Sequence, residues 1–197
     1  MDMVALLGRT LAFSLAAGIN LYATVALVGL AVRFGWVAVP SDYQAFGNPW
    51  VIGIASALYL VEFVADKVPW VDTLWDAVHT FIRPIGGAAL AVASLGHASP
   101  TMTVLAALLG GAVATGSHAT KTGTRVIANT SPEPFSNWFL SLAEDGFVVA
   151  LGVLALKFPV IALAVSVVVI LVIVSLATAL LRALRRRFGS APASVAM

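Results

Sequence analysis

Cysteine is absent from the 197-residue chain, so neither a disulfide nor a thiolate metal site can form. Charge is also scarce. Asp, Glu, Lys and Arg together make up 10% of the sequence, whereas soluble domains carry about a quarter. Hydrophobic residues reach 60%, and the mean hydropathy is +1.00. This composition excludes an ordinary soluble domain and predicts a protein whose first partner is the lipid bilayer.

The common enzyme signatures are missing as well. The sequence has no phosphate-binding loop, no dinucleotide-binding glycine fingerprint, no nucleophile elbow and no zinc-protease helix. The last apolar run ends in an arginine cluster, Arg182 with residues 185–187, which is typical of a stop-transfer signal. We therefore expect no catalytic activity, no organic cofactor and no nucleic-acid partner.

Long uncharged runs predict an all-α, polytopic membrane protein with about six transmembrane helices. The pattern indicates one transmembrane domain over residues 1–188 and a disordered tail over residues 189–197. A kink is expected at Pro84, and Asp72 is the expected N-cap of the third helix. The predicted helices cover residues 4–32, 49–67, 72–95 and 101–128, then a fifth from the Ser131-Pro-Glu-Pro134 turn to residue 157, and a sixth from residue 159 into the arginines.

Basic residues predict the orientation. With both termini in the cytoplasm, nine of the eleven Lys and Arg residues lie on the cytoplasmic side, and only Arg33 and Lys157 lie outside. We therefore expect both termini to be cytoplasmic.

A weak internal similarity indicates an inverted repeat of three helices each, with halves over residues 1–96 and 100–188. The motif Gly18-Ile-Asn20-Leu-Tyr-Ala-Thr24 is similar to Gly116-Ser-His118-Ala-Thr-Lys-Thr122. In each half a later helix carries acids. Inverted halves are the arrangement of many secondary transporters.

Ionisable residues are concentrated on the polar faces of otherwise apolar helices. Glu62 and Asp66 are four residues apart and share a face. Asp72, Asp76, His79 and Arg83 share a face on the next helix, in a stripe about 16 Å long. Two further polar stripes follow, one on each of the next two predicted helices. The candidate ion-binding or substrate-binding residues are Asn20, Glu62, Asp66, Asp76, His79, Arg83, His118, Lys121, Arg125, Asn137, Glu144 and Asp145.

Two explanations compete for these residues. Intramembrane acids and bases are costly and mark ion pathways, but they also pair between helices simply to hold them together. A pair between Glu144 and either Arg83 or Arg125 would be of this structural kind. A metal site is a sharper alternative, because carboxylates with histidines suit Mn, Zn or Fe. Its candidate ligands are Asp76, His79, His118 and Glu144, so a divalent cation is the one cofactor the sequence leaves open.

Three segments together resemble a known family. They are residues 18–24, residues 62–87, and the stretch from His118 through the string Ser131-Pro-Glu-Pro-Phe-Ser-Asn137 to Asp145. They look like the bacterial membrane proteins grouped as the domain of unknown function 4126 family, with a match from about residue 10 to about residue 150. The resemblance implies a multi-pass protein of the bacterial inner membrane and supplies no substrate.

Three functions remain open. The first is a small secondary transporter or exchanger that moves a proton, cation or small solute through a buried ionisable site. The second is a non-transporting accessory protein with an ion-paired core. The third is a protein that binds anionic lipid headgroups near the cytoplasmic leaflet. All three are compatible with a homo-oligomer.

Overall fold

The computed structural model describes residues 3–38, 41–130 and 135–188, and every regular element among them is helical. The predicted turn at residues 131–134 and the predicted tail at residues 189–197 lie outside the described residues. The elements are α1 (Met3–Ile19), α2 (Leu21–Arg33), the short 3₁₀ helix η1 (Ser41–Gly47), α3 (Pro49–Ala65), α4 (Pro69–Leu95), α5 (Pro100–Asn129), α6 (Phe135–Lys157) and α7 (Pro159–Phe188).

The first predicted helix is wrong as a continuous element, because it is broken in its middle at Asn20. This residue has an extended backbone (φ −144°, ψ 97°), and its side-chain oxygen accepts a hydrogen bond from the Ala23 amide at the start of α2. Asparagine is a preferred N-cap because its short side chain satisfies a free amide of the first helical turn. The break could not be recognised from the apolar run of residues 4–32, because the capping residue, Asn20, is one polar residue among many apolar ones.

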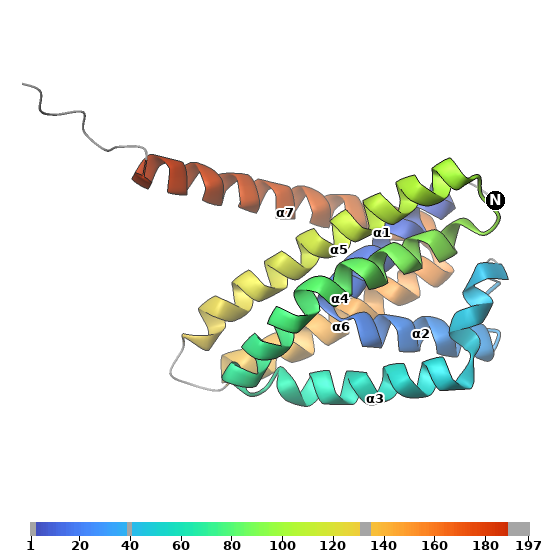
Figure 1. Cartoon of the computed structure of the whole chain (residues 1–197), viewed down its shortest axis with the longest axis horizontal. Helices are drawn as coiled ribbons and strands as arrows, with labels where there is room; N and C mark the ends of the chain where they lie inside the picture. Colours follow the sequence, from blue (N-terminus) through green and yellow to red (C-terminus); the bar gives the residue numbers. More distant parts are fainter. Residues whose placement is uncertain (1–2, 39–40, 131–134, 189–197) are drawn as a thin grey trace, which may run out of the picture.

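α1 and α2 form a helical hairpin that ends inside the bundle (Figure 1), and the residue at its tip, Asn20, is buried. At the start of α1, Gly8 packs against the Pro159 backbone and Arg9 Nε donates to the Ala155 carbonyl (3.4 Å). The end of α2 returns to the same end of the molecule, where Gly29 packs against Phe46 of η1. The hairpin therefore enters and leaves from one end of the bundle, without passing through it.

The five later helices run along the length of the bundle in alternating directions (Figure 1). Four of them, α4 to α7, are long and apolar enough to cross a membrane. α3, with 17 residues, is shorter, at about 25 Å. A multi-pass membrane protein fits these helices, while the predicted count of six spans is not confirmed.

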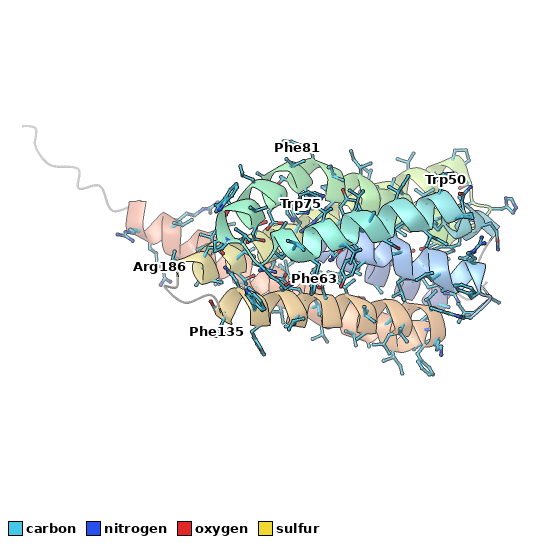
Figure 2. The ribbon with its side chains drawn as sticks, turned by 90° about the horizontal axis from the view of Figure 1, so that it is seen from below. Trp50, Phe63, Trp75, Phe81, Phe135 and Arg186 are labelled. Carbon is cyan, nitrogen blue, oxygen red and sulfur yellow. The ribbon has the colours of Figure 1, made fainter. Side chains whose placement is uncertain are left out.

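The two ends of the described chain lie at opposite ends of the bundle (Figure 1). α1 begins beside the α6–α7 connection, whereas α7 ends beyond the opposite end. Figure 2 shows the same separation between Trp50, near the start of α3, and Arg186, near the end of α7. The expectation that both termini share one face does not follow from this arrangement, because the hairpin adds no crossing.

Small residues bring α1, α4 and α5 into close contact. Gly87 of α4 and Gly110 of α5 face each other so closely that a Cβ on either would meet the other's carbonyl. Ser14 of α1 donates to the Gly87 carbonyl (3.2 Å). Small residues permit such backbone approach in membranes, where van der Waals packing drives helix association.

One local expectation changes with the structure. α4 begins at Pro69 with Val68 as its N-cap, so Asp72 lies inside the first turn and the predicted cap at Asp72 is wrong. The helix also continues as one element through Pro84. The inverted repeat is not confirmed: the motif at Asn20 breaks a helix, whereas the related motif at His118 lies inside unbroken α5.

The outward surface is apolar along most of its length. Large side chains project from the helices, among them Phe81, which is 76% exposed, and Trp50, at 79% (Figure 2). Most of the second half of α7 is exposed as well. Such a surface is stable when lipid covers it.

The close contact between α4 and α5 predicts a difference between two glycines of the same helix. Gly110→Ala forces α5 away from α4 and lowers the free energy of unfolding by about 1–3 kcal/mol. Gly123→Ala, where a Cβ meets nothing within 4 Å, leaves stability unchanged or raises it by up to about 1 kcal/mol. Thermal and denaturant unfolding in detergent micelles measure both. Equal effects of the two substitutions would contradict the packing described.

Candidate functional site

The charged residues gather in one half of the bundle, between the hairpin tip and the end of the molecule that holds the α3–α4 connection. α3 supplies Glu62 near its last turn, and Asp66 is its C-cap. The other charged side chains come from the first half and middle of α4, the second half of α5 and the first half of α6. Seven side chains form the ionic cluster: Glu62, Asp66, Asp76, Arg83, Lys121, Arg125 and Glu144. All are at most 2% exposed except Glu144, whose side chain is 12% exposed.

Arg83 joins the cluster to the hairpin. Its Nη2 lies 2.7 Å from Glu62 Oε1 and 3.2 Å from Asp76 Oδ1. Its Nη1 donates to the Gly18 carbonyl at the end of α1 (3.1 Å) and to His118 Nδ1 (2.7 Å). A cation is favoured at the C-terminus of a helix, where carbonyls without intrahelical partners concentrate negative charge. Arg83 thus stabilises the break in the first apolar run.

Lys121 occupies the centre of the cluster. Its Nζ lies 3.1 Å from Asp66, 3.4 Å from Glu62, 3.8 Å from Glu144 and 3.9 Å from Asp76. One ammonium therefore contacts all four carboxylates, and each of those carboxylates comes from a helix other than α5. Lysine suits this position because its charge is compact and its three donors rotate freely.

Arg125 closes the cluster on the side of α6. Its Nη2 lies 2.6 Å from Glu144 Oε2 and 3.1 Å from Asp66 Oδ2. Its Nη1 donates to the Asp66 carbonyl at the end of α3 (2.9 Å). The structure thus contains one of the two pairs expected for Glu144, with Arg125, whereas Arg83 pairs with Glu62 and Asp76.

Acids outnumber bases in this region. The cluster holds four carboxylates and three cations, and two more buried carboxylates, Asp72 and Asp145, lie beside it. Glu62 Oε2 has no hydrogen-bond partner among the described residues. A buried acceptor without a partner is costly, and so is an unbalanced negative charge in a low dielectric. The arrangement favours the binding of a proton or a cation.

The hairpin tip is tied to α6 and α3 through Asp145. Asn20 Nδ2 donates to Asp145 Oδ1 (2.9 Å), and Tyr59 Oη donates to Asp145 Oδ2 (3.3 Å). Asn20 and Asp145 were both predicted site residues, and the structure brings them into direct contact.

Polar contacts continue from the cluster toward the nearer end of the bundle. Asn129 Nδ2 donates to Asp72 Oδ2 (3.2 Å), and Asn137 Nδ2 donates to Asn129 Oδ1 (2.7 Å). Asn137, a predicted site residue, therefore lies at the outer end of a polar column that runs inward to Asn20. Beyond the tip the buried core is mostly apolar and includes Phe13, Leu90 and Leu151.

The two predicted histidines lie at the edge of the cluster and do not face each other. His118 accepts a hydrogen bond from Arg83 at Nδ1, and its Nε2 lies 3.2 Å from the Asp76 carbonyl. His79 places Nδ1 2.7 Å from the Trp75 carbonyl and Nε2 3.0 Å from Tyr22 Oη. Both rings have both nitrogens engaged. Within the described ranges, no group of three or more His, Asp or Glu side chains is placed to hold a metal ion.

A cavity of about 290 Å³ adjoins the cluster between α5, α6 and α7. Glu144 and Lys121 lie at its inner end, and Val168 and Val172 of α7 form its apolar wall. Thr124, Val168 and Val172 are exposed, so the cavity opens on the outer surface of the bundle.

A family model described as a domain of unknown function (DUF4126) matches residues 7–179. The chain belongs to this family. No curated protein and no solved structure matches the chain. The match extends the resemblance seen in the sequence in both directions and includes every residue of the ionic cluster and of the cavity lining.

Sequence reasoning missed two tyrosines of this site. Tyr59 contacts Asp145, and Tyr22 contacts His79. A signal existed for each. Tyr59 stands three residues before Glu62 and therefore on the same helix face, and Tyr22 belongs to the motif at residues 18–24. Tyrosine is also common at membrane interfaces, so its presence in an apolar sequence does not by itself indicate a site.

The hydrogen bonds predict opposite neutral tautomers for the two histidines. Arginine only donates, so His118 must carry its proton on Nε2. The Trp75 carbonyl only accepts, so His79 must carry its proton on Nδ1. Nitrogen-15 spectra of histidine-labelled protein in lipid distinguish the tautomers, with signals assigned through His79→Gln and His118→Gln. The same tautomer at both positions would contradict these contacts.

Removing Arg83 should be far more costly than removing a surface arginine. Arg83→Met leaves Glu62 and Asp76 with Lys121 as their only close cation among the described residues and lowers the free energy of unfolding by about 3–5 kcal/mol. Arg33→Met, at an exposed position, changes it by less than about 0.5 kcal/mol. The double variant Arg83→Met with Glu62→Gln should recover part of the loss. Unfolding in micelles tests this, and additive effects in the double variant would contradict a shared cluster.

Proposed function

We propose that the protein is a small secondary transporter or exchanger that binds a proton or a cation at the ionic cluster. The observation that carries the proposal is the meeting of an acid-rich buried cluster with the tip of a hairpin that ends inside the bundle. Non-helical backbone at membrane depth is tolerated where protein buries it or where it lines a cavity. Broken helices of this kind form the ion and substrate sites of many transporters.

The distribution of polarity supports access from one side. The column from Asn137 to Asn20 is polar, while the opposite half is closed by apolar side chains and by the contact of Gly18 with Ala114. An ion that entered along the column would stop at the hairpin tip. Transport would then require the hairpin to shift against α4 and α5, as in alternating access between packed elements.

The excess of carboxylates supports a positively charged substrate. An anion would meet four carboxylates around Lys121 and would be repelled. A proton or cation would instead reduce the unbalanced charge. Carboxylates that share a site titrate together, so cation binding would displace a proton from the group as a whole.

A second candidate is a non-transporting accessory protein with an ion-paired core. It is favoured by the pairing of Arg83, Lys121 and Arg125, each of which lies within 4.0 Å of at least two carboxylates. On that hypothesis the cluster neither releases protons nor binds ions. The flux experiment below separates the two candidates.

For the orientation, we propose that the C-terminal end of α7 is cytoplasmic and the start of α1 lies across the membrane. Lys67 and the arginines of α7 lie toward one end of the bundle, whereas Arg9, Arg33 and Lys157 lie toward the other. The positive-inside rule then places the arginine-rich end in the cytoplasm. Reporter fusions before residue 1 and after residue 197 test this. We expect opposite locations, and the same location for both would contradict the hairpin topology.

Glu144→Gln should abolish coupled transport without unfolding the protein. The amide keeps the shape and removes the charge, and Arg125 retains Asp66 at 3.1 Å. Proteoliposomes carrying an internal pH dye are given Na⁺, K⁺, Mg²⁺ or Mn²⁺ gradients at two pH values. We expect cation-driven proton flux from the parent protein and a loss of at least about tenfold in the variant.

Matched controls are Glu144→Asp, which keeps the charge, and Lys157→Gln, which changes an exposed charge at the far end of the same helix. Both should retain most of the flux. Undiminished flux in Glu144→Gln would refute the role of the cluster. No flux from the parent with any cation would favour the accessory protein.

A further inference from the structure

The cavity between α5, α6 and α7 offers a second, more specific indication of what the site binds. Its wall is apolar and formed largely by α7, and its inner end meets the ionic cluster at Glu144. At about 290 Å³ it is close to the lower limit of small-molecule sites, roughly 300 Å³. It is large enough for a head group and the first part of a chain, while a longer chain would extend through its opening.

The polar groups at the inner end accept hydrogen bonds and have few free donors. Glu144 is the least buried carboxylate of the cluster. Thr120 donates its hydroxyl proton to the Gly116 carbonyl (3.0 Å), and Thr124 donates to the Lys121 carbonyl (2.7 Å). Neither hydroxyl proton is therefore available to a ligand in the cavity.

Lys121 is the cation among the residues that line the cavity, and its ammonium is already paired with the carboxylates of the ionic cluster. Its side chain is 1% exposed, and its Nζ is surrounded by four carboxylates. An anionic head group would have to replace those contacts and lie beside their charge. A neutral head group would leave the acid excess of the cluster unchanged. A positively charged head group would reduce that excess, and it would form a charge-assisted hydrogen bond with Glu144, a carboxylate that it would share with Arg125.

We propose that this cavity binds the ammonium head of a hydrophobic amine, with its alkyl chain directed along α7. This inference rests on the proposed function and specifies its substrate class, an amphipathic organic cation. The second half of α7 is exposed and apolar beyond Val172, at residues such as Leu176. The apolar wall thus continues outside the cavity, where a chain would lie between the protein and lipid.

Photocrosslinking tests the site directly. The full-length protein in phosphatidylcholine nanodiscs is labelled with dodecylammonium that carries a diazirine in its chain. Labelled residues are mapped by mass spectrometry, and unlabelled dodecylammonium, dodecanol and dodecyl sulfate compete. We expect labels on the cavity wall of α7 and α6, with dodecylammonium competing at least about tenfold better than the other two, as one charge-assisted hydrogen bond predicts.

Two tryptophan substitutions on α7 form a matched pair. Val172 lines the cavity and Val174 does not, although both are 52% exposed. Val172→Trp fills the opening and should abolish labelling of the cavity, whereas Val174→Trp should leave it unchanged. Glu144→Gln should weaken competition by dodecylammonium by about tenfold to the level of dodecanol. Uniform labelling of lipid-facing residues would overturn the proposal, as would dodecyl sulfate competing as well as the amine.

The outcomes also separate this inference from the proposed function. Cation-driven proton flux with Na⁺ or another inorganic cation, without specific labelling of the cavity, would overturn the amine site and leave the transporter in place. Specific labelling without proton flux upon addition of dodecylammonium would support a binding site and contradict transport.

Discussion

The structure depends on the cost of ionised groups inside an apolar body. Arg83 shows how that cost is met. It contacts two carboxylates, a histidine and the carbonyl end of α1, so the charges and the broken helix stabilise each other. Without Arg83 the end of α1 would leave carbonyls without partners in the middle of the bundle. Without the break at Asn20, the Arg83 guanidinium would lose its hydrogen bond to the Gly18 carbonyl. The hairpin and the ionic cluster are therefore one unit.

This interdependence gives the molecule two unlike halves. Small residues such as Gly18, Gly87, Gly110 and Ala114 pack one half closely, and the buried polar column runs through the other half toward the end with the α3–α4 connection. A proton or cation that changed the balance of charge at Glu62 or Glu144 would change the interactions that hold Arg83 and Arg125, and through Arg83 the end of α1. A small change of charge would thus bias the position of the hairpin, which is how ligand switches act on a packed element.

Much of the site could be predicted from the sequence, because helical spacing places residues such as Glu62 and Asp66, or Lys121 and Arg125, on one face. Because charged residues are scarce in the chain, the few helix faces that carry them are easily recognised. The family resemblance is confirmed over residues 7–179. The break at Asn20 could not be predicted from hydropathy, because both arms of the hairpin are as apolar as a membrane span. The predicted count of spans and the predicted cytoplasmic N-terminus both assumed that residues 4–32 form one crossing helix, and neither is confirmed. The cavity could not be predicted from the sequence either, because it depends on how α7 packs against α5 and α6.

The most direct test of a cluster that exchanges protons for cations is a measurement of proton release. Purified protein in weakly buffered detergent solution is mixed with each inorganic cation and with dodecylammonium while the pH is recorded. If the acid-rich cluster binds a cation in place of a proton, the parent protein releases protons on addition of at least one of them, and Glu144→Gln releases markedly fewer. Absence of release with every cation across the neutral pH range would contradict this account. The charges would then be permanently paired, and their role would be structural.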